Sequence, residues 1–238
     1  MQVAIHQPSY WPWPRYIHKV MSADVFVYLD TVQFSKNGVQ NRNQIKTATG
    51  AHWLTLSVKH RLGQRIQDTR IAEPGALEKH WQTIANNYRR TPGFPRWKDE
   101  LERLLLGMQT ESLCDAAIAT TEWILDKLGV QNKRVRASEI SGAIGTASAL
   151  IASICSQLGA SRYLTGVGAI EYMQAGDFSA IGCEVWMQEW SGLTYPQAYP
   201  DAGFVPDLST LDLLMNCPED AKELIAAAGQ WAPLWVRA

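Results

Sequence analysis

The sequence predicts an α/β fold in which a mostly parallel sheet is flanked by helices, with one helical insert. The first observation is a strand, a helix and a second strand in succession at residues 2–5, about 15–22 and 24–29. Such a βαβ unit makes a parallel pair of strands with a right-handed crossover. The second observation is that strands and helices alternate again from about residue 134. Together they indicate a Rossmann-like layout.

Each element of the first unit has its own signal. Residues 2–5 are a short, mostly apolar run, and three prolines between residues 8 and 14 require a loop after it. Pro14 suits the first turn of a helix. Residues 24–29 are almost continuously apolar, as expected for a central strand.

The middle of the chain is predicted to differ from both ends. Residues 31–50 are polar and rich in Asn and Gln, whereas residues 53–59 alternate as a half-exposed strand does. Residues 66–71 are expected to pair with that strand across Gly63. Residues 73–128 have a helical pattern, and we expect them to form a helical insert within a single domain of 238 residues.

The last third returns to alternating elements. We expect short strands at 134–137, 162–164 and 183–188, and a helix at 146–158. A short helix is predicted around 169–173. Pro206 and Pro218 should each begin a helix, and Asp207 or Ser209 is expected to cap the first of these.

Composition narrows the class of protein. The formal net charge is -1, which disfavours bulk binding of nucleic acid. The four cysteines form no C-x-x-C pair and the five histidines lack metal-ligand spacing, so we expect reduced cysteines and no metal site. No signal peptide and no apolar stretch long enough to span a bilayer is indicated. A cytoplasmic protein is therefore expected, with a small molecule as its partner.

The first candidate site lies where the first two strands end. His6 and Gln7 follow one strand, Asp30 follows the next, and ligands of parallel sheets bind beyond these carboxyl ends. His6 would move protons or contact a phosphate, although a histidine bonded to its own loop remains an alternative. Lys19, one turn from Tyr16, would meet an anion unless it is a solvated lysine.

A second polar set follows in the Asn- and Gln-rich segment. Its amides offer both donors and acceptors, and its arginine fits phosphate or carboxylate. These residues are Gln33, Asn41, Arg42, Asn43 and Lys46. A site that reads a sugar or nucleotide is favoured over an exposed polar loop.

Two further places are weaker candidates. Backbone N–H groups at Thr165-Gly166-Val167-Gly168 would cradle an anion, with Tyr172 nearby, unless this is only a tight turn between strand and helix. His80, with Lys59 upstream, lies in a helical pattern, where a structural role is the alternative.

Several of these motifs together resemble the WbqC-like protein family. They are V-A-I-H-Q-P-S-Y-W-P-W, A-D-V-F-V-Y-L-D-T-V-Q-F-S-K, Q-N-R-N-Q-I-K-T, W-L-T-L-S-V, K-H-W, L-G-A-S-R-Y-L-T-G and P-D-L-S-T-L-D-L-L-M-N, and they cover nearly the whole chain. The resemblance implies a bacterial transferase that decorates a sugar in surface-glycan (lipopolysaccharide O-antigen type) biosynthesis, with aminoacyl (glycyl) transfer among its suggested activities. Tyr10 and His80 join the expected site through these motifs. Arg15 departs from the family, which usually has glycine there.

The opening strand, loop, helix and strand are also similar to the start of the HIGH-superfamily nucleotidyltransferases. That likeness implies a nucleotide-dependent adenylyltransferase or ligase, with ATP or another nucleotide as cofactor. Tyr16 stands about where that superfamily has a histidine, and no H-x-G-H motif is present. A non-catalytic ligand-binding protein is the third alternative. The expected substrate is an activated sugar, an aminoacyl donor or a nucleotide.

The predicted site divides into two groups. The predicted catalytic residues are His6, Lys19, Asp30 and His80, and the predicted substrate-binding residues are Gln7, Tyr10, Tyr16, Gln33, Asn41, Arg42, Asn43, Lys46, Lys59, Thr165, Gly166 and Tyr172.

Overall fold

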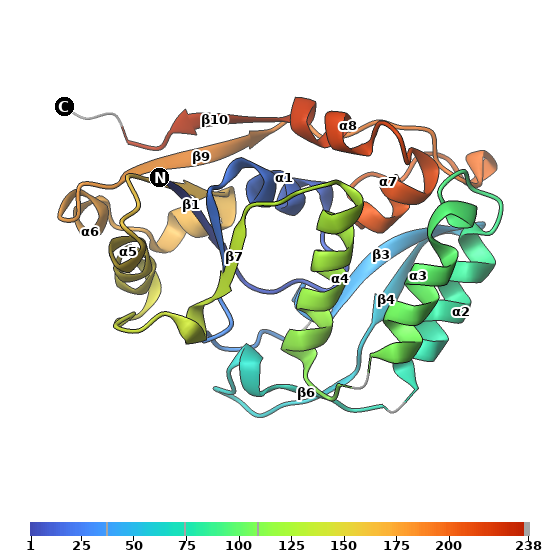
Figure 1. Cartoon of the computed structure of the whole chain (residues 1–238), viewed down its shortest axis with the longest axis horizontal. Helices are drawn as coiled ribbons and strands as arrows, with labels where there is room; N and C mark the ends of the chain where they lie inside the picture. Colours follow the sequence, from blue (N-terminus) through green and yellow to red (C-terminus); the bar gives the residue numbers. More distant parts are fainter. Residues whose placement is uncertain (37, 74, 109, 236–238) are drawn as a thin grey trace.

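A six-stranded sheet forms the centre of the molecule, with the strand order β10-β9-β8-β1-β2-β7 (Figure 1). The computed structural model describes residues 1–36, 38–73, 75–108 and 110–235. The strands of this sheet are β1 (Gln2–His6), β2 (Val25–Tyr28), β7 (Lys133–Arg136), β8 (Arg162–Thr165), β9 (Glu184–Trp190) and β10 (Gly229–Pro233). All neighbours pair in parallel except β10, which is antiparallel to β9. The prediction of a mostly parallel sheet is confirmed, whereas the sequence pattern gives no sign of β10.

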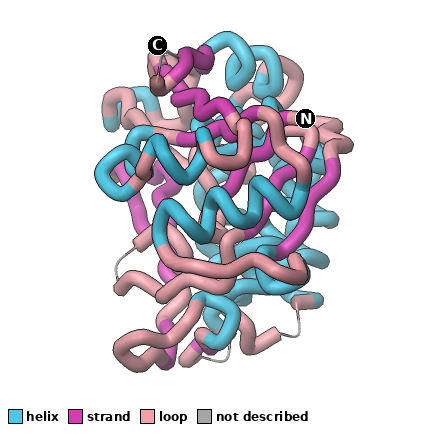
Figure 2. Tube along the Cα trace, turned by 90° about the vertical axis from the view of Figure 1, so that its left-hand side faces the viewer, coloured by secondary structure: helices cyan, strands magenta, loops and turns pink. Residues whose placement is uncertain are grey.

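Helices cover both faces of this sheet, which matches the α/β prediction. Val3 and Ile5 of β1 pack into one apolar cluster with α5 (Ala147–Leu158) and α6 (Ala175–Ser179). Ala4, between them, faces the opposite cluster, because successive strand residues point to opposite sides. Among the described residues, six helices contribute to that second cluster: α1 (Pro14–Ser22), α2 (Ala76–Tyr88), α3 (Phe94–Gly107), α4 (Leu113–Lys127), α7 (Thr210–Asn216) and α8 (Ala221–Ala228). Seen from the left-hand side of Figure 1, helices lie in front of the strands (Figure 2).

The first βαβ unit follows the sequence prediction closely. Pro14 opens α1, where its missing N–H loses no helical hydrogen bond, and the helix ends at Ser22. Tyr16, Ile17 and Val20 are buried on the inner side of α1. In the sheet Val3 pairs with Val25 and His6 with Tyr28. The carboxyl ends of β1 and β2 therefore meet at one edge.

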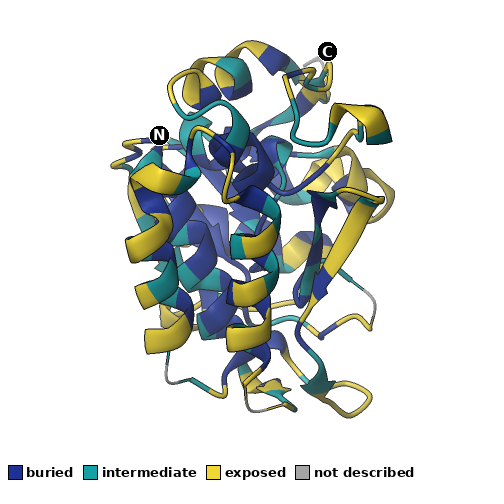
Figure 3. Cartoon of the chain, turned by 90° about the vertical axis from the view of Figure 1, so that its right-hand side faces the viewer, coloured by how far each residue is buried: buried dark blue, intermediate teal, exposed yellow. Residues whose placement is uncertain are grey.

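Residues 73–128 contain the expected helices. They are α2 (Ala76–Tyr88), α3 (Phe94–Gly107) and α4. The outer sides of α2 and α3 are exposed and their inner sides buried (Figure 3). The turn between them approaches α7, since the N–H of Gly93 donates to the carbonyl of Met215 at 2.9 Å. A Cβ at Gly93 would stand 2.5 Å from the carbonyl oxygen of Leu214, so this close approach requires glycine.

Residues 31–71 contain two hairpins, an arrangement that differs from the one predicted for this segment. The polar segment includes β3 (Arg42–Thr47), which pairs antiparallel with β4 (Gly50–Thr55). The single strand expected at 53–59 is divided between β4 and β5 (Val58–Lys59). Across Gly63, β5 pairs only with β6 (Arg70–Ile71), because residues 66–68 form a 3-10 turn, η1 (Ile66–Asp68).

Three expected helices are shifted or shorter in the structure. The helix expected from Pro206 begins at Thr210, because Ser209 caps it by accepting from the N–H of Leu211, while Asp207 has a φ of +53°. The last helix, α8, begins at Ala221 rather than at Pro218. The helix expected at 169–173 is a 3-10 segment, η3 (Val167–Tyr172). Two further 3-10 turns are η2 (Ala137–Glu139) and η4 (Pro200–Ala202).

Candidate active site

A small cavity opens at the carboxyl ends of β1 and β8. The chain passes outward from β1 through β2 to β7 and then crosses to β8, on the other side of β1. Where connections leave neighbouring strands in opposite directions, a crevice forms that commonly holds ligands. The cavity here is about 260 Å³. Its described lining is Ile5, His6, Gln7, Lys19, Leu29, Ile151, Tyr163, Thr165, Gly166, Gly168, Ala169 and Tyr172.

Lys19 gives this cavity its charge. Its side chain comes from α1 and the residue is only 7% exposed, yet it makes no hydrogen bond or ion pair to any described residue. Burial lowers the pKa of Lys19 to about 7, and the positive charge of Arg15 adds to this lowering. No Asp or Glu is among the described lining residues. An unpaired cation in such a place favours an anionic ligand.

Glycine at position 166 makes room for that lysine. A Cβ there would stand 3.3 Å from Nζ of Lys19. Gly166 follows β8 directly and precedes η3, so backbone and ammonium group meet just beyond the strand end. Thr165, the last residue of β8, is also buried in the lining.

His6, another lining residue, is a neutral imidazole. Burial, followed by the charge of Lys19, lowers the pKa of His6 to about 3. Its Nδ1 lies 3.0 Å from the carbonyl oxygen of Gln7, which can only accept, so Nδ1 carries the proton and Nε2 is an acceptor. The ring of Tyr16 packs edge-on against it at 4.8 Å between centroids.

Of the predicted residues, the structure brings six together in the cavity lining. They are His6, Gln7, Lys19, Thr165, Gly166 and Tyr172. Tyr16 is not among the described lining residues, but its ring packs against His6, which is. The amide of Gln7 accepts from Nε2 of Gln40 at 2.5 Å, which ties the loop after β1 to the chain before β3.

Asp30 and His80 lie elsewhere, engaged with other side chains. The carboxylate of Asp30 accepts from the N–H and the hydroxyl of Ser138, at 3.0 and 2.6 Å. His80 and Tyr10 share a hydrogen bond of 2.8 Å between Nδ1 and the phenolic oxygen, and burial lowers the pKa of His80 to about 4. These contacts hold the segments after β2 and β1 in place.

Three residues of the second polar set, Arg42, Asn43 and Lys46, lie on β3, and the set is used mainly in packing. Asn43 donates to the carbonyl of Trp11 at 2.6 Å, and Asn41 to that of Leu56 at 2.8 Å. Lys46 is 1% exposed and donates to Gln197 and to the carbonyl of Gly203. Arg42 covers the ring of Trp53 at 4.3 Å, and Gln33 forms an isolated bridge with Arg65. The structure therefore divides the predicted site into two regions.

A buried network supports Lys46. Its backbone N–H donates to the hydroxyl of Tyr88 at 3.1 Å, and that hydroxyl donates to Asp212 at 2.5 Å. Tyr195 donates to the other carboxylate oxygen at 2.8 Å. Burial raises the pKa of Asp212, and the charge of Lys46 opposes that rise.

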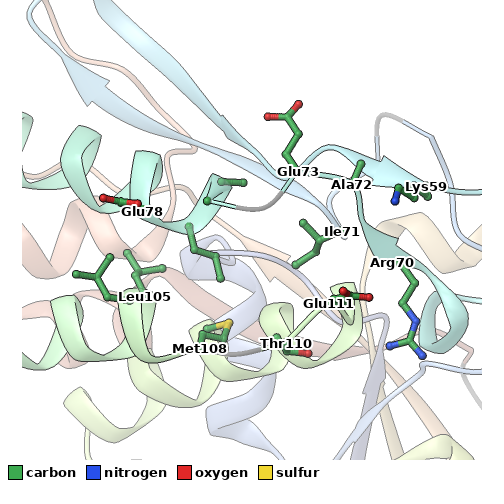
Figure 4. Close-up of a pocket in the computed structure, with 14 residues that line it drawn as sticks. Lys59, Arg70, Ile71, Ala72, Glu73, Glu78, Leu105, Met108, Thr110 and Glu111 are labelled. Carbon is green, nitrogen blue, oxygen red and sulfur yellow. The ribbon is translucent and has the colours of Figure 1, made fainter.

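Lys59 lines a different and larger cavity of about 880 Å³ between β5–β6 and the helices α2 and α3 (Figure 4). Charges of both signs line it: Lys59, Arg70, Glu73, Glu78 and Glu111. None of its described lining residues is a buried lysine, since Lys59 is exposed. The cavity at β1 and β8 is therefore the stronger candidate site.

Tyr163 is a lining residue that the sequence reasoning missed. It lies two positions before Thr165 in β8, and residues i and i+2 of a strand share a face. Its spacing of two residues from Thr165 in a predicted strand could have identified it as a lining residue.

In the described part of the chain, no group of three or more His, Cys, Asp or Glu side chains is placed to hold a metal ion. In the same residues no helix has both the length and the apolar character needed to cross a membrane.

Fold and site together define a mixed α/β protein whose sheet has, at its carboxyl edge, a cavity lined by a buried lysine without an acidic partner among the described residues. The chain belongs to the WbqC-like protein family, whose model matches residues 7–224. It is 30% identical over 227 residues to "Uncharacterized protein Rv1507c" of Mycobacterium tuberculosis (strain ATCC 25618 / H37Rv), covering 94% of this chain and 97% of the relative. No solved structure matches. The family resemblance seen in the motifs is thus confirmed.

Proposed function

We propose that this protein is a transferase of bacterial surface-glycan biosynthesis, of the lipopolysaccharide O-antigen type. Its anionic substrate, a phosphorylated or nucleotide-activated sugar, would bind in the cavity at β1 and β8. The observation that carries this proposal is Lys19, a buried lysine with no acidic partner at the point where parallel sheets bind ligands. Membership of the WbqC-like family supports the sugar-directed part of it.

The two titratable groups of the pocket suit different tasks. A pKa of about 7 lets Lys19 either hold an anion as an ammonium group or exchange a proton near neutral pH. With a pKa of about 3, His6 stays neutral and offers Nε2 as a hydrogen-bond acceptor for a substrate hydroxyl. Proton transfer is therefore assigned to Lys19, and orientation of the substrate to His6.

Aminoacyl (glycyl) transfer is the specific reaction proposed. A hydroxyl or amino group of the sugar attacks the carbonyl carbon of an activated glycyl donor. The new ester or amide bond forms as the bond to the donor's leaving group breaks. The Lys19 ammonium group, which also holds the anionic substrate, donates a proton to the leaving group, and the acceptor's proton then restores it, so that charge and protons balance.

We infer a single Rossmann-like, HIGH-superfamily-like domain with a helical insert at about 73–128, working in the cytoplasm. Asn41, which directly precedes β3, and Arg42, Asn43 and Lys46 on β3 support the site in this proposal, since their side chains contact other parts of the protein.

The test is a thermal-shift screen with sugar phosphates, nucleotide-sugars, aminoacyl donors and ATP. A ligand at about 100 times its Kd stabilises the folded state by about 2.7 kcal/mol, or about 5–10 °C for a chain of this size. Lys19→Met should abolish the shift, while Lys98→Met, at an exposed position of α3, should keep it.

Each result separates the alternatives. Equal thermal shifts in Lys19→Met and in the wild-type protein would rule out the proposed anion site at Lys19. ATP binding with exchange of pyrophosphate would identify an adenylyltransferase. Ligand binding with no turnover in any donor and acceptor pair would identify a binding protein.

A further inference from the structure

The large apolar side chains that are most exposed lie on segments that leave the carboxyl ends of parallel strands, or on a loop bonded to such a segment. Among the described residues, Leu62 is 96% exposed, Ile144 73% and Val167 64%. Val167 follows β8 directly and begins η3, beside Gly166 of the candidate site. Ile144 lies in the segment between β7 and α5. Both segments follow carboxyl ends of parallel strands.

Leu62 belongs to the same edge through hydrogen bonds. The N–H of Ile66 donates to the carbonyl of Val32 at 2.9 Å, and that of Gln67 to the carbonyl of Asp30 at 3.0 Å. These acceptors follow the carboxyl end of β2. The loop that carries Leu62 is therefore attached beside the segment that leaves the sheet at this edge.

The turn that presents Leu62 is held in shape. The N–H of Gln64 donates to the carbonyl of Arg61 at 3.1 Å, and the side chain of Gln64 accepts from the N–H of Arg61 at 2.9 Å. Gly63 has a φ of +79°, a value that glycine adopts without strain at this position of a turn. Leu62 thus stands at a preformed apex rather than on a loose strand.

Basic side chains surround this apex. Lys59, Arg61, Arg65 and Arg70 are all exposed, and none forms an ion pair with any described residue. Residues 59–70 hold these four cations and one carboxylate, Asp68, in a chain whose formal net charge is -1. A cavity of about 630 Å³ lies against the turn, and no Asp or Glu is among its described lining residues.

We propose that this edge binds reversibly to the surface of an anionic lipid bilayer. The basic side chains of residues 59–70 contact headgroup phosphates, and Leu62 enters the region of the acyl chains. Basic residues near an anionic membrane gain affinity from its surface potential, and an apolar side chain adds burial. A nucleic acid fits this surface less well, because the apex carries an aliphatic side chain rather than an aromatic ring on which bases stack.

Such binding does not depend on the proposed reaction. It would turn the mouth of the cavity at β1 and β8 toward the membrane, because Tyr172, a lining residue, and Val167, between the lining residues Gly166 and Gly168, are both exposed. A substrate anchored in the bilayer could then reach Lys19 without leaving the lipid surface.

Vesicle sedimentation of the full chain tests the proposal. Vesicles of phosphatidylcholine alone are compared with vesicles that also contain phosphatidylglycerol, at low and at high salt. We expect binding only to the anionic vesicles, weakened by salt. Exchanging both Arg61 and Arg65 for Gln should lower the affinity about 25-fold, at about a factor of five for each lost cation. Leu62→Asn should lower it by about 5-fold, through partial loss of apolar burial.

Matched variants elsewhere serve as controls. Arg89 and Arg90, exposed at the end of α2, are both exchanged for Gln, and Leu106, 48% exposed, is exchanged for Asn. These proteins should bind as the wild type does, and circular dichroism checks that all variants fold. Absence of binding to anionic vesicles at low salt would overturn the proposal, as would equal losses in the controls. Tight binding of a single-stranded oligonucleotide, with the same affinity in the wild-type protein and in Leu62→Asn, would overturn it and indicate a nucleic-acid surface.

Discussion

Two buried lysines show how differently the protein uses the same side chain. Lys46 on β3 is 1% exposed and donates to Gln197 and Gly203 close to the carboxylate of Asp212. Lys19 on α1 is 7% exposed and has no partner among the described residues. Removing a buried cation that has its partners leaves those partners unsatisfied and lowers stability, whereas a buried cation without partners itself destabilises the fold.

The largest expected effect is at Lys46. Lys46→Met should lower the free energy of unfolding by about 3 kcal/mol, because it leaves the carbonyl of Gly203 and the Asp212 network without their buried cation. Urea unfolding followed by tryptophan fluorescence measures it. Lys98→Met, on the exposed surface of α3, should change stability by less than about 0.5 kcal/mol. A loss at position 46 no larger than the loss at position 98 would contradict the comparison.

At Lys19 the same substitution should change the free energy of unfolding in the opposite direction. Lys19→Met is expected to raise the free energy of unfolding by about 2 kcal/mol at pH 6, because the folded state no longer holds an isolated charge. The pKa of Lys19 is about 7 in the folded protein and about 10.4 when unfolded, so between these values the unfolded chain binds more protons. The wild-type protein should therefore gain stability from pH 7 to pH 10, relative to Lys19→Met.

Unfolding curves of both proteins across that pH range measure the difference. The stabilisation by Lys19→Met should be full below pH 7 and should shrink as the pH rises. A Lys19→Met protein that is less stable than the wild type at pH 6 would show that the lysine has a partner after all.

The sequence predicts the region around Lys19 well because local patterns govern it. The order of strand, proline-bearing loop, helix and strand places His6 and Lys19 on neighbouring elements, and parallel pairing brings their ends to one edge. Thr165 and Gly166 follow another strand of the same sheet, so they arrive there by the same rule. Each step depends on periodicity and on strand direction, both of which are visible in the chain.

The region around Lys46 was harder because its partners are distant in sequence. Gln197 and Gly203 lie more than 150 residues away, in a segment without regular strands. A run of amides and cations looks the same whether it meets substrate or the protein itself. Only tertiary contacts show that Asn43 and Lys46 are satisfied by the chain, so one predicted site became two regions.

A smaller effect is expected on the affinity for sulfate, which should depend on the charge of Lys19. Sulfate keeps its charge across the neutral range, so any change in its affinity reports on the protein. Affinity should fall about 10-fold from pH 6 to pH 8.5 as Lys19, with its pKa of about 7, loses its proton. His6, with a pKa of about 3, adds no titration in this range. Calorimetry at several pH values measures the affinity, and a dependence that persists in Lys19→Met would place the titrating group elsewhere.

The smallest predicted effect depends on a single methyl group. Gly166→Ala would place a Cβ 3.3 Å from Nζ of Lys19, whereas Gly168→Ala would meet nothing within 4 Å, although both glycines line the cavity. Neither backbone needs a positive φ, so both variants should fold with nearly unchanged stability. The ammonium group must move by a few tenths of an ångström in Gly166→Ala, and sulfate affinity should fall about 3-fold, as expected when a charge-assisted hydrogen bond is displaced. Equal affinities of the two variants would mean that the anion sits away from Lys19, and the contrast between the two lysines would then be one of stability alone.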